Sequence, residues 1–198
     1  MILKVVQVSS GVFFLFFLDS FHPSSCCCCL NLIAIFFTTI ARFVKNAANL
    51  FNPNSNEKSN PAKHAQYFES PTVIRYEKDQ VLAPHFDANK AAATEDANRG
   101  GQTLATLLLY LNDVENGGNT RFGRLIDSND SSGDALVVKP KMGDALLFFP
   151  ADENGTFDDR LEHEGCTAVD TKWIARIWRH IDRVPPPFGL SIGALSKL

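Results

Sequence analysis

Residues 103–123, TLATLLLYLNDVENGGNTRFG, join two short apolar runs through a turn that contains two glycines. Short β-like runs separated by turn residues are typical of strands. Further runs of this kind follow Pro71, and we expect strands at TVIRYE (72–77), ALVVKP (135–140), DALLFFP (144–150) and KWIARIWRHI (172–181). No stretch between them has a long 3.6-residue period. The sequence therefore predicts a mainly β fold, either a sandwich or a barrel, with a double-sheet jelly roll among the options.

The N-terminal quarter of the chain differs from this pattern. Residues 1–50 contain apolar runs such as GVFFLFFL and CLNLIAIFF, and the second run is followed by Arg42 and Lys45. Apolar runs with a positive flank are typical of signal peptides and membrane anchors. We expect a signal or membrane anchor within residues 7–41, or else a non-native N-terminus. An anchor favours an endoplasmic reticulum or other secretory-pathway membrane, with the cytoplasm as the alternative.

The rest of the chain divides by composition. Residues 51–70 are rich in Asn, Ser and Pro and are predicted to form a linker. Residues 71–190 hold the predicted β-rich domain, and residues 191–198 form a tail. The whole chain carries a net charge of −3, without the broad basic surface that binding to a phosphate backbone requires. We therefore expect no nucleic-acid partner.

The segment APHFDAN, residues 83–89, contains the first candidate for chemistry. In a strand, residues two apart point to the same side, so His85 and Asp87 would project into one space. A third ligand could come from His163, which lies far away in sequence but could be on a neighbouring strand. Two histidines and one carboxylate suit a non-haem Fe(II) site, and tetrahedral zinc is the chemical alternative.

Other interpretations of these residues are ordinary. A His-X-Asp pair is often a hydrogen-bonded surface pair, and His163 could be a loop histidine. His180, at the end of the last predicted strand, is expected to be solvated. Lys172 and Tyr76 add weight to the functional reading, because an ammonium and a phenol can both bind a carboxylate.

Four segments, in this order, resemble the catalytic domain of the prolyl 4-hydroxylase family. They are RYEKDQVLAPHFDAN, GGQTLATLLLYLNDVENGGNTRFG, VKPKMGDALLFFP and LEHEGCTAVDTKWIARIW. The resemblance covers roughly residues 72 to 184. It implies a double-stranded β-helix (jelly-roll) fold with few flanking helices.

The resemblance also implies roles for individual residues. His85, Asp87 and His163 would bind Fe(II). Lys172 would pair with the far carboxylate of 2-oxoglutarate, and Tyr76 would hydrogen-bond to it. Thr106 could be a further contact to 2-oxoglutarate, and ascorbate is implied as a cofactor. Gly117 and Gly118 are interpreted as turn residues.

The implied activity is a 2-oxoglutarate-dependent dioxygenase that hydroxylates proline in a peptide, with O2 as co-substrate and succinate and CO2 as products. One alternative keeps this chemistry but acts on another peptide or a small molecule. The other is a non-catalytic, membrane-tethered jelly-roll module that binds a partner. Residues 1–70 do not resemble the helices and strands that support the family's core, so we expect that supporting layer to be missing.

Overall fold

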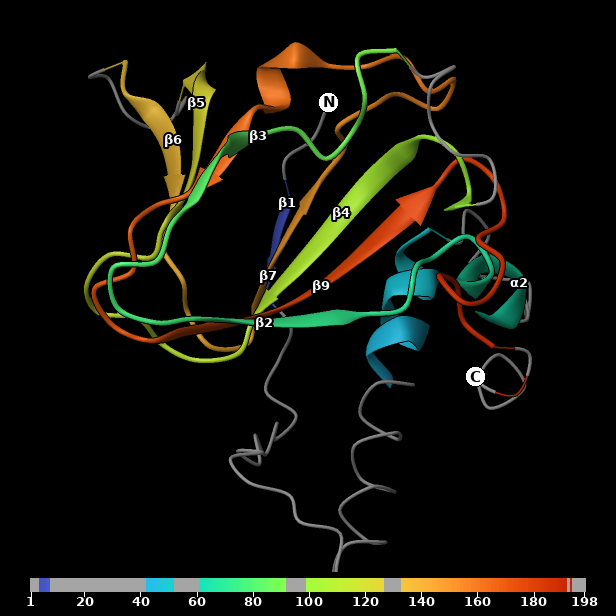
Figure 1. Ribbon diagram of the computed structural model, residues 1–198, viewed down its shortest axis with the longest axis horizontal. Helices are drawn as coiled ribbons and strands as arrows, with labels where there is room; N and C mark the ends of the chain where they lie inside the picture. Colours follow the sequence, from blue (N-terminus) through green and yellow to red (C-terminus); the bar gives the residue numbers. More distant parts are fainter. Residues whose placement is uncertain are drawn as a thin grey trace, which may run out of the picture.

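Two antiparallel sheets form the framework of the protein (Figure 1). The computed structural model describes residues 4–7, 42–51, 61–91, 99–126, 133–191 and 193. The larger sheet has the order β1-β7-β4-β9-β2, and the smaller has the order β3-β8-β5-β6. The strands are β1 (Lys4–Gln7), β2 (Thr72–Tyr76), β3 (Leu82–His85), β4 (Thr103–Tyr110), β5 (Thr120–Ile126), β6 (Ala135–Val138), β7 (Asp144–Phe148), β8 (His163–Gly165) and β9 (Lys172–His180). The helical elements are α2 (Pro61–Ala65), the 3-10 helix η3 (Asp159–Leu161) and a helix over residues 42–50.

The strands after Pro71 alternate between the two sheets as the chain proceeds, except that β5 and β6 are consecutive and both lie in the smaller sheet. β2, β4, β7 and β9 enter the larger sheet, and β3, β5, β6 and β8 form the smaller one. This arrangement is the double-stranded β-helix that the sequence predicts. All eight of these core strands lie after residue 71.

The central strand β4 is buried along its whole length. Ala105, Leu107 and Leu109 belong to an apolar cluster on one face of the larger sheet. Leu108 and Tyr110 belong to a second cluster, which also contains Phe122 of β5 and so lies between the two sheets. A strand with both faces covered reads as a nearly continuous apolar run, as TLATLLLYL does.

The predicted strands are confirmed, with small differences at their ends. Two core strands, β3 and β8, were not predicted as separate strands. They are short, with the sequences LAPH and HEG, and neither has the β-branched or alternating apolar pattern that marks a strand. Pairing with each other and, for β8, with β5 gives them their extended conformation.

A supporting layer covers the outer face of the larger sheet, contrary to our expectation. Val44, Ala47 and Ala48 of the helix over residues 42–50 pack into the same apolar cluster as Leu107 and Ile177. In Figure 1 this helix and α2 lie near the same end of the molecule, away from β5 and β6. Amphipathic packing of a few small residues is sufficient for this contact, and it leaves little trace in the sequence.

Residues 61–70, which we assigned to a linker, are folded onto the sheet. α2 contributes Ala65 to the apolar cluster, and Phe68 is only 1% exposed. The backbone N–H of Glu69 donates to the Trp178 carbonyl at 3.0 Å, and that of His180 donates to the Tyr67 carbonyl at 2.8 Å. The folded unit therefore includes this stretch.

The predicted anchor falls almost entirely outside the described residues, since residues 8–41 are not among them. Of this region, β1 pairs with β7 at the edge of the larger sheet. Within the described ranges, no helix combines the length and apolar character needed to cross a bilayer.

We predict that Phe68→Ala lowers the free energy of unfolding by about 3 kcal/mol or more, because a fully buried aromatic side chain would leave a cavity. Denaturation in urea, followed by tryptophan fluorescence, measures this change. Phe188→Ala is the matched control, since Phe188 is 41% exposed, and it should cost about 1 kcal/mol or less. Equal and small effects of the two changes would show that residues 61–70 do not belong to the folded unit.

Candidate active site

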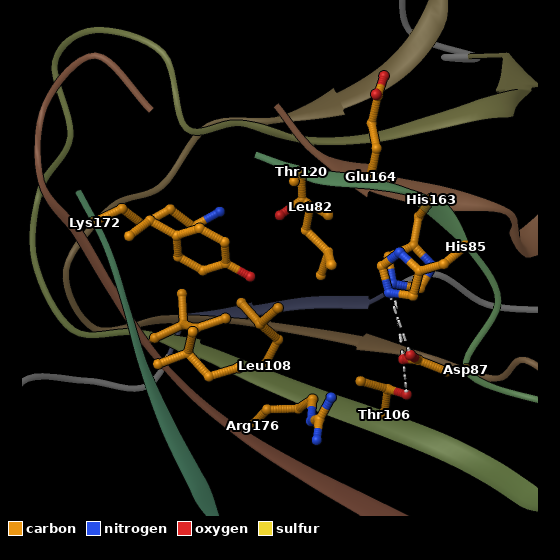
Figure 2. Close-up of a pocket in the computed structure, with 14 residues that line it drawn as sticks. Leu82, His85, Asp87, Thr106, Leu108, Thr120, His163, Glu164, Lys172 and Arg176 are labelled. Atoms are coloured by element: carbon orange, nitrogen blue, oxygen red, sulfur yellow. Dashed lines mark hydrogen bonds and ion pairs between the residues drawn. The ribbon is translucent and has the colours of Figure 1, made fainter. Parts of the chain in front are cut away.

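A cavity between the two sheets collects the residues that the sequence singled out (Figure 2). His85, Asp87, His163, Thr106, Tyr76 and Lys172 all line it. They come from β2, β3, β4, β8 and β9 and from the bend after β3. All six predicted site residues are thus brought together by the fold.

The pairing of β3 with β8 places two of the three predicted metal ligands opposite each other. In the antiparallel register, His85 lies opposite His163, and their ring centroids are 4.3 Å apart. Asp87 does not continue the strand as we expected, because β3 ends at His85 and Asp87 lies in the following bend. The bend still brings its carboxylate within 3.6 Å of His85 Nε2 and 3.8 Å of His163 Nε2.

Hydrogen bonds to the backbone orient both imidazoles. His85 Nδ1 lies 2.9 Å from the Ala83 carbonyl, and His163 Nδ1 lies 3.0 Å from the Leu161 carbonyl. A carbonyl can only accept, so Nδ1 carries a proton in each ring, and Nε2 is the nitrogen that faces Asp87 and could bind a metal. Burial also lowers the pKa of His163, which favours its neutral form.

Asp87 is held from its other side by Thr106. The Thr106 hydroxyl on β4 donates to Asp87 Oδ2 at 2.6 Å, and Figure 2 shows this contact beside the two histidines. One potential ligand atom from each of His85, Asp87 and His163 lies within 4.8 Å of the others. Two imidazole nitrogens and one carboxylate oxygen on one side of an ion fit the donor set of non-haem Fe(II), with positions left open for other ligands.

Lys172 lies toward the other end of the cavity and is buried, with 2% of its surface exposed. Its ammonium donates to the Gly118 carbonyl at 2.6 Å and lies 5.2 Å and 5.7 Å from the ring centres of Tyr76 and Tyr110. Burial lowers the pKa of Lys172 to about 8. Gly118 was interpreted as a turn residue only. The turn, with φ of +66° at this glycine, also supplies the carbonyl that holds the lysine.

Tyr76 and Thr106 occupy different parts of the cavity. Tyr76 packs its ring against the Lys172 ammonium, and burial raises the pKa of its phenol. Thr106 lies at the metal end, where Asp87 accepts its hydrogen bond. The apolar part of the cavity wall includes Ile74, Leu108 and Ile174.

Sequence interpretation was wrong for one residue, His180, and missed another, Arg176. His180 is buried at 4% exposure instead of solvated, with Nδ1 2.9 Å from the Gly101 carbonyl and Nε2 3.3 Å from Glu69 Oε1. Arg176 lines the cavity but was not predicted. It could have been found from the two-residue period of a strand, since residues 172, 174 and 176 share one face of β9.

We predict that Thr106→Val weakens Fe(II) binding about tenfold, because Asp87 would lose the hydrogen bond that orients it. Titration with Fe(II) under anaerobic conditions, without 2-oxoglutarate, isolates this effect from any contact with the co-substrate. Thr106→Ser keeps the hydroxyl and should bind the metal nearly as the original chain does. Unchanged metal affinity in the valine variant would remove Thr106 from the metal site.

Comparison with known proteins agrees with this geometry. Over 139 residues the chain is 35% identical to "Probable prolyl 4-hydroxylase 7" of Arabidopsis thaliana, which covers 65% of this chain and 43% of that protein. It is 37% identical over 123 residues to "Prolyl 4-hydroxylase 1" of the same plant, covering 60% of this chain and 42% of that protein. The chain thus spans less than half the length of these plant relatives.

Among solved structures, the chain is similar to the viral collagen prolyl hydroxylase vCPH from Paramecium Bursaria Chlorella virus-1 in complex with 2OG. The identity is 31%, the TM-score is 0.48, and the match covers 58% of this chain and 60% of that one. The family model described as the 2OG-Fe(II) oxygenase superfamily matches residues 71–180, more than half of the chain. The resemblance inferred from the sequence is confirmed, and the chain belongs to the 2OG-Fe(II) oxygenase superfamily, whose cofactors are Fe(II) and 2-oxoglutarate.

Proposed function

We propose that this protein is a dioxygenase that uses Fe(II) and 2-oxoglutarate to hydroxylate proline residues in a peptide. The observation that carries the proposal is the pairing of two groups in one cavity. The His85–Asp87–His163 cluster lies at one end, and the buried Lys172 ammonium lies toward the other. A short dicarboxylate that binds a metal through one end can be held by the ammonium at its other end.

Each cavity residue has a defined task in this proposal. His85, Asp87 and His163 hold the metal, and Thr106 fixes the orientation of Asp87. Lys172 binds the far carboxylate of 2-oxoglutarate, with Tyr76 as a second donor beside it. Leu108, Ile74 and Ile174 exclude water from the space between. When bound, iron and 2-oxoglutarate supply the oxidising chemistry, in which O2 is consumed, 2-oxoglutarate becomes succinate and CO2, and the substrate gains a hydroxyl group.

A proline-containing peptide is the substrate class that the relatives favour, since the names of the plant proteins and of the viral enzyme describe prolyl hydroxylases. A Pro-rich chain prefers the extended polyproline II conformation, which reduces the entropy lost on binding. Ascorbate is included in the proposal because it is typical of the family.

The non-catalytic alternative has less support. A binding module would have no need to keep three metal ligands and a buried anchoring lysine in one cavity. All four residues are present and converge, and backbone carbonyls orient both imidazoles through their Nδ1 atoms. Burying an ammonium beside two aromatic rings costs free energy, so its retention favours a ligand-binding role.

We predict that the purified chain releases succinate when given Fe(II), 2-oxoglutarate, ascorbate and a proline-rich peptide, and that the peptide stimulates this release. His163→Ala should abolish turnover because it removes a metal ligand. Lys172→Ala should act mainly through a raised KM for 2-oxoglutarate. Mass spectrometry of the peptide, which gains one oxygen atom per hydroxylation, identifies the product.

Two results would contradict parts of the proposal. Succinate release that no peptide stimulates would retain the iron chemistry and exclude the prolyl substrate. A folded, iron-loaded protein that releases no succinate would favour the binding module.

We predict that the affinity for 2-oxoglutarate decreases about tenfold between pH 7 and pH 9. The pKa of Lys172 is lowered to about 8 by burial, so the charged form that binds a carboxylate is lost as the pH rises through 8. Burial raises the pKa values of Tyr76, Tyr110 and Cys166, which keeps these neighbours uncharged over most of this range. Calorimetric titration with Mn(II) in place of iron measures the dissociation constant.

Lys172→Met provides the control for this pH dependence. The variant should bind 2-oxoglutarate more weakly and with a flat profile between pH 7 and pH 9. If the variant keeps the tenfold decrease, another group is responsible and Lys172 is not the anchor.

A further inference from the structure

Arg176 places a guanidinium in the wall of the cavity, at a position that the metal and co-substrate do not explain. It lies on β9, four residues beyond Lys172 on the same face, and its strand neighbours are Leu108 of β4 and Thr72 of β2. Figure 2 shows the side chain reaching toward the side of the cavity where Thr106 and Asp87 lie. Arg176 is therefore closer than Lys172 to the metal ligands along the strand.

The guanidinium has no anionic partner among the described residues, none of whose carboxylates forms an ion pair with it within 4.0 Å. Asp87 and Glu69 contribute to its electrostatic surroundings, but both are engaged elsewhere. Asp87 accepts from Thr106 and faces the two imidazoles. Glu69 lies 3.3 Å from Arg99 and 3.3 Å from His180.

Trp178 fixes the orientation of this group. The Arg176 guanidinium carbon lies 3.6 Å from the centre of the Trp178 ring, which is a stacking distance. The indole Nε1 of Trp178 is itself buried, and no acceptor for it occurs in the described part of the chain. Arg176 is therefore a cation in the cavity wall that is held in place from behind by this indole, which does not itself line the cavity.

A count of charges indicates what the cation requires. The charges of a divalent metal, Asp87, 2-oxoglutarate and Lys172 together sum to zero. Glu164, which also lines the cavity, is neutralised by Arg121 at 2.9 Å. Arg176 then adds one positive charge to a half-buried wall, where an unpaired charge is costly. An anion from outside the loaded site would remove this cost, and a substrate that carries one is such a source.

We propose that Arg176 selects substrates that carry a carboxylate close to the proline that is hydroxylated. This inference rests on the proposed function and defines its substrate class further. The carboxylate can come from a neighbouring Asp or Glu side chain or from the α-carboxylate of a C-terminal proline. Arg suits this task because its planar donors can bind a carboxylate through two hydrogen bonds.

The test uses three peptides that end in a single proline. Two are amidated at the C-terminus and differ only in a Glu or a Gln beside the proline. The third is the Gln peptide with a free C-terminal carboxylate. For the original chain, we expect kcat/KM to be about tenfold higher for a carboxylate-bearing peptide than for its neutral match. Arg176→Gln should remove this preference, and Arg176→Lys should restore part of it. The two carboxylate-bearing peptides distinguish the sources of the anion.

Arg75→Gln is the charge-matched control. Arg75 lies on the neighbouring strand β2, pairs with Glu77 at 3.4 Å and does not line the cavity. It should leave the preference unchanged. An equal loss of preference in this variant would mean that Arg176 acts only through net charge, which would overturn the proposed contact.

Binding gives a readout that does not depend on turnover. Fluorescence anisotropy of labelled peptides, with Mn(II) and 2-oxoglutarate present, should show tighter binding of the carboxylate-bearing peptides by the original chain and not by Arg176→Gln. Equal binding of acidic and neutral peptides by the original chain overturns the inference, whether or not succinate is released. The inference is also overturned if Arg176→Gln raises the dissociation constant of 2-oxoglutarate in the absence of peptide, because the arginine would then serve the co-substrate.

Discussion

The burial of β4 on both faces is the constraint on which the rest of the structure depends. Ala105, Leu107 and Leu109 need an apolar cover on one face, which the helix over residues 42–50, α2 and Phe68 provide. Leu108 and Tyr110 need a cover on the opposite face, which the smaller sheet provides. A cavity remains between the two sheets, and β4 presents the Thr106 hydroxyl to Asp87 inside it.

Burial also organises the chemistry of this cavity. It lowers the pKa of Lys172 and of His163 and raises that of Tyr76, and in each case the charged form is the one disfavoured. The protein offsets this cost with fixed dipoles, such as the Gly118 carbonyl at Lys172 and the Leu161 carbonyl at His163. The side chains of the site are thus oriented before a ligand enters. A bound metal and co-substrate would supply the opposite charges that these buried groups lack.

Arg176 is a further, half-buried cation whose countercharge, in our proposal, comes from the substrate. Lys172 and Arg176 share one face of β9, so a single strand presents two cations to the cavity at different distances from the metal ligands. The deeper cation suits a co-substrate carboxylate, and the one nearer the metal ligands suits a group that enters from outside. In the proposed function, a difference of four residues along one strand separates two binding tasks.

The sequence by itself determined the strand pattern of most of the core and which residues would gather at the candidate site, because these depend on local patterning and on side-chain chemistry. TLATLLLYL predicted a strand, and two histidines, an aspartate and a lysine in family order predicted the site. Only the tertiary structure decided how these residues meet. The pairing of β3 with β8 brings His85 opposite His163 across a separation that no local pattern encodes. The folded state of residues 61–70 and the burial of His180 likewise follow from contacts with distant segments, which the composition of each segment does not record.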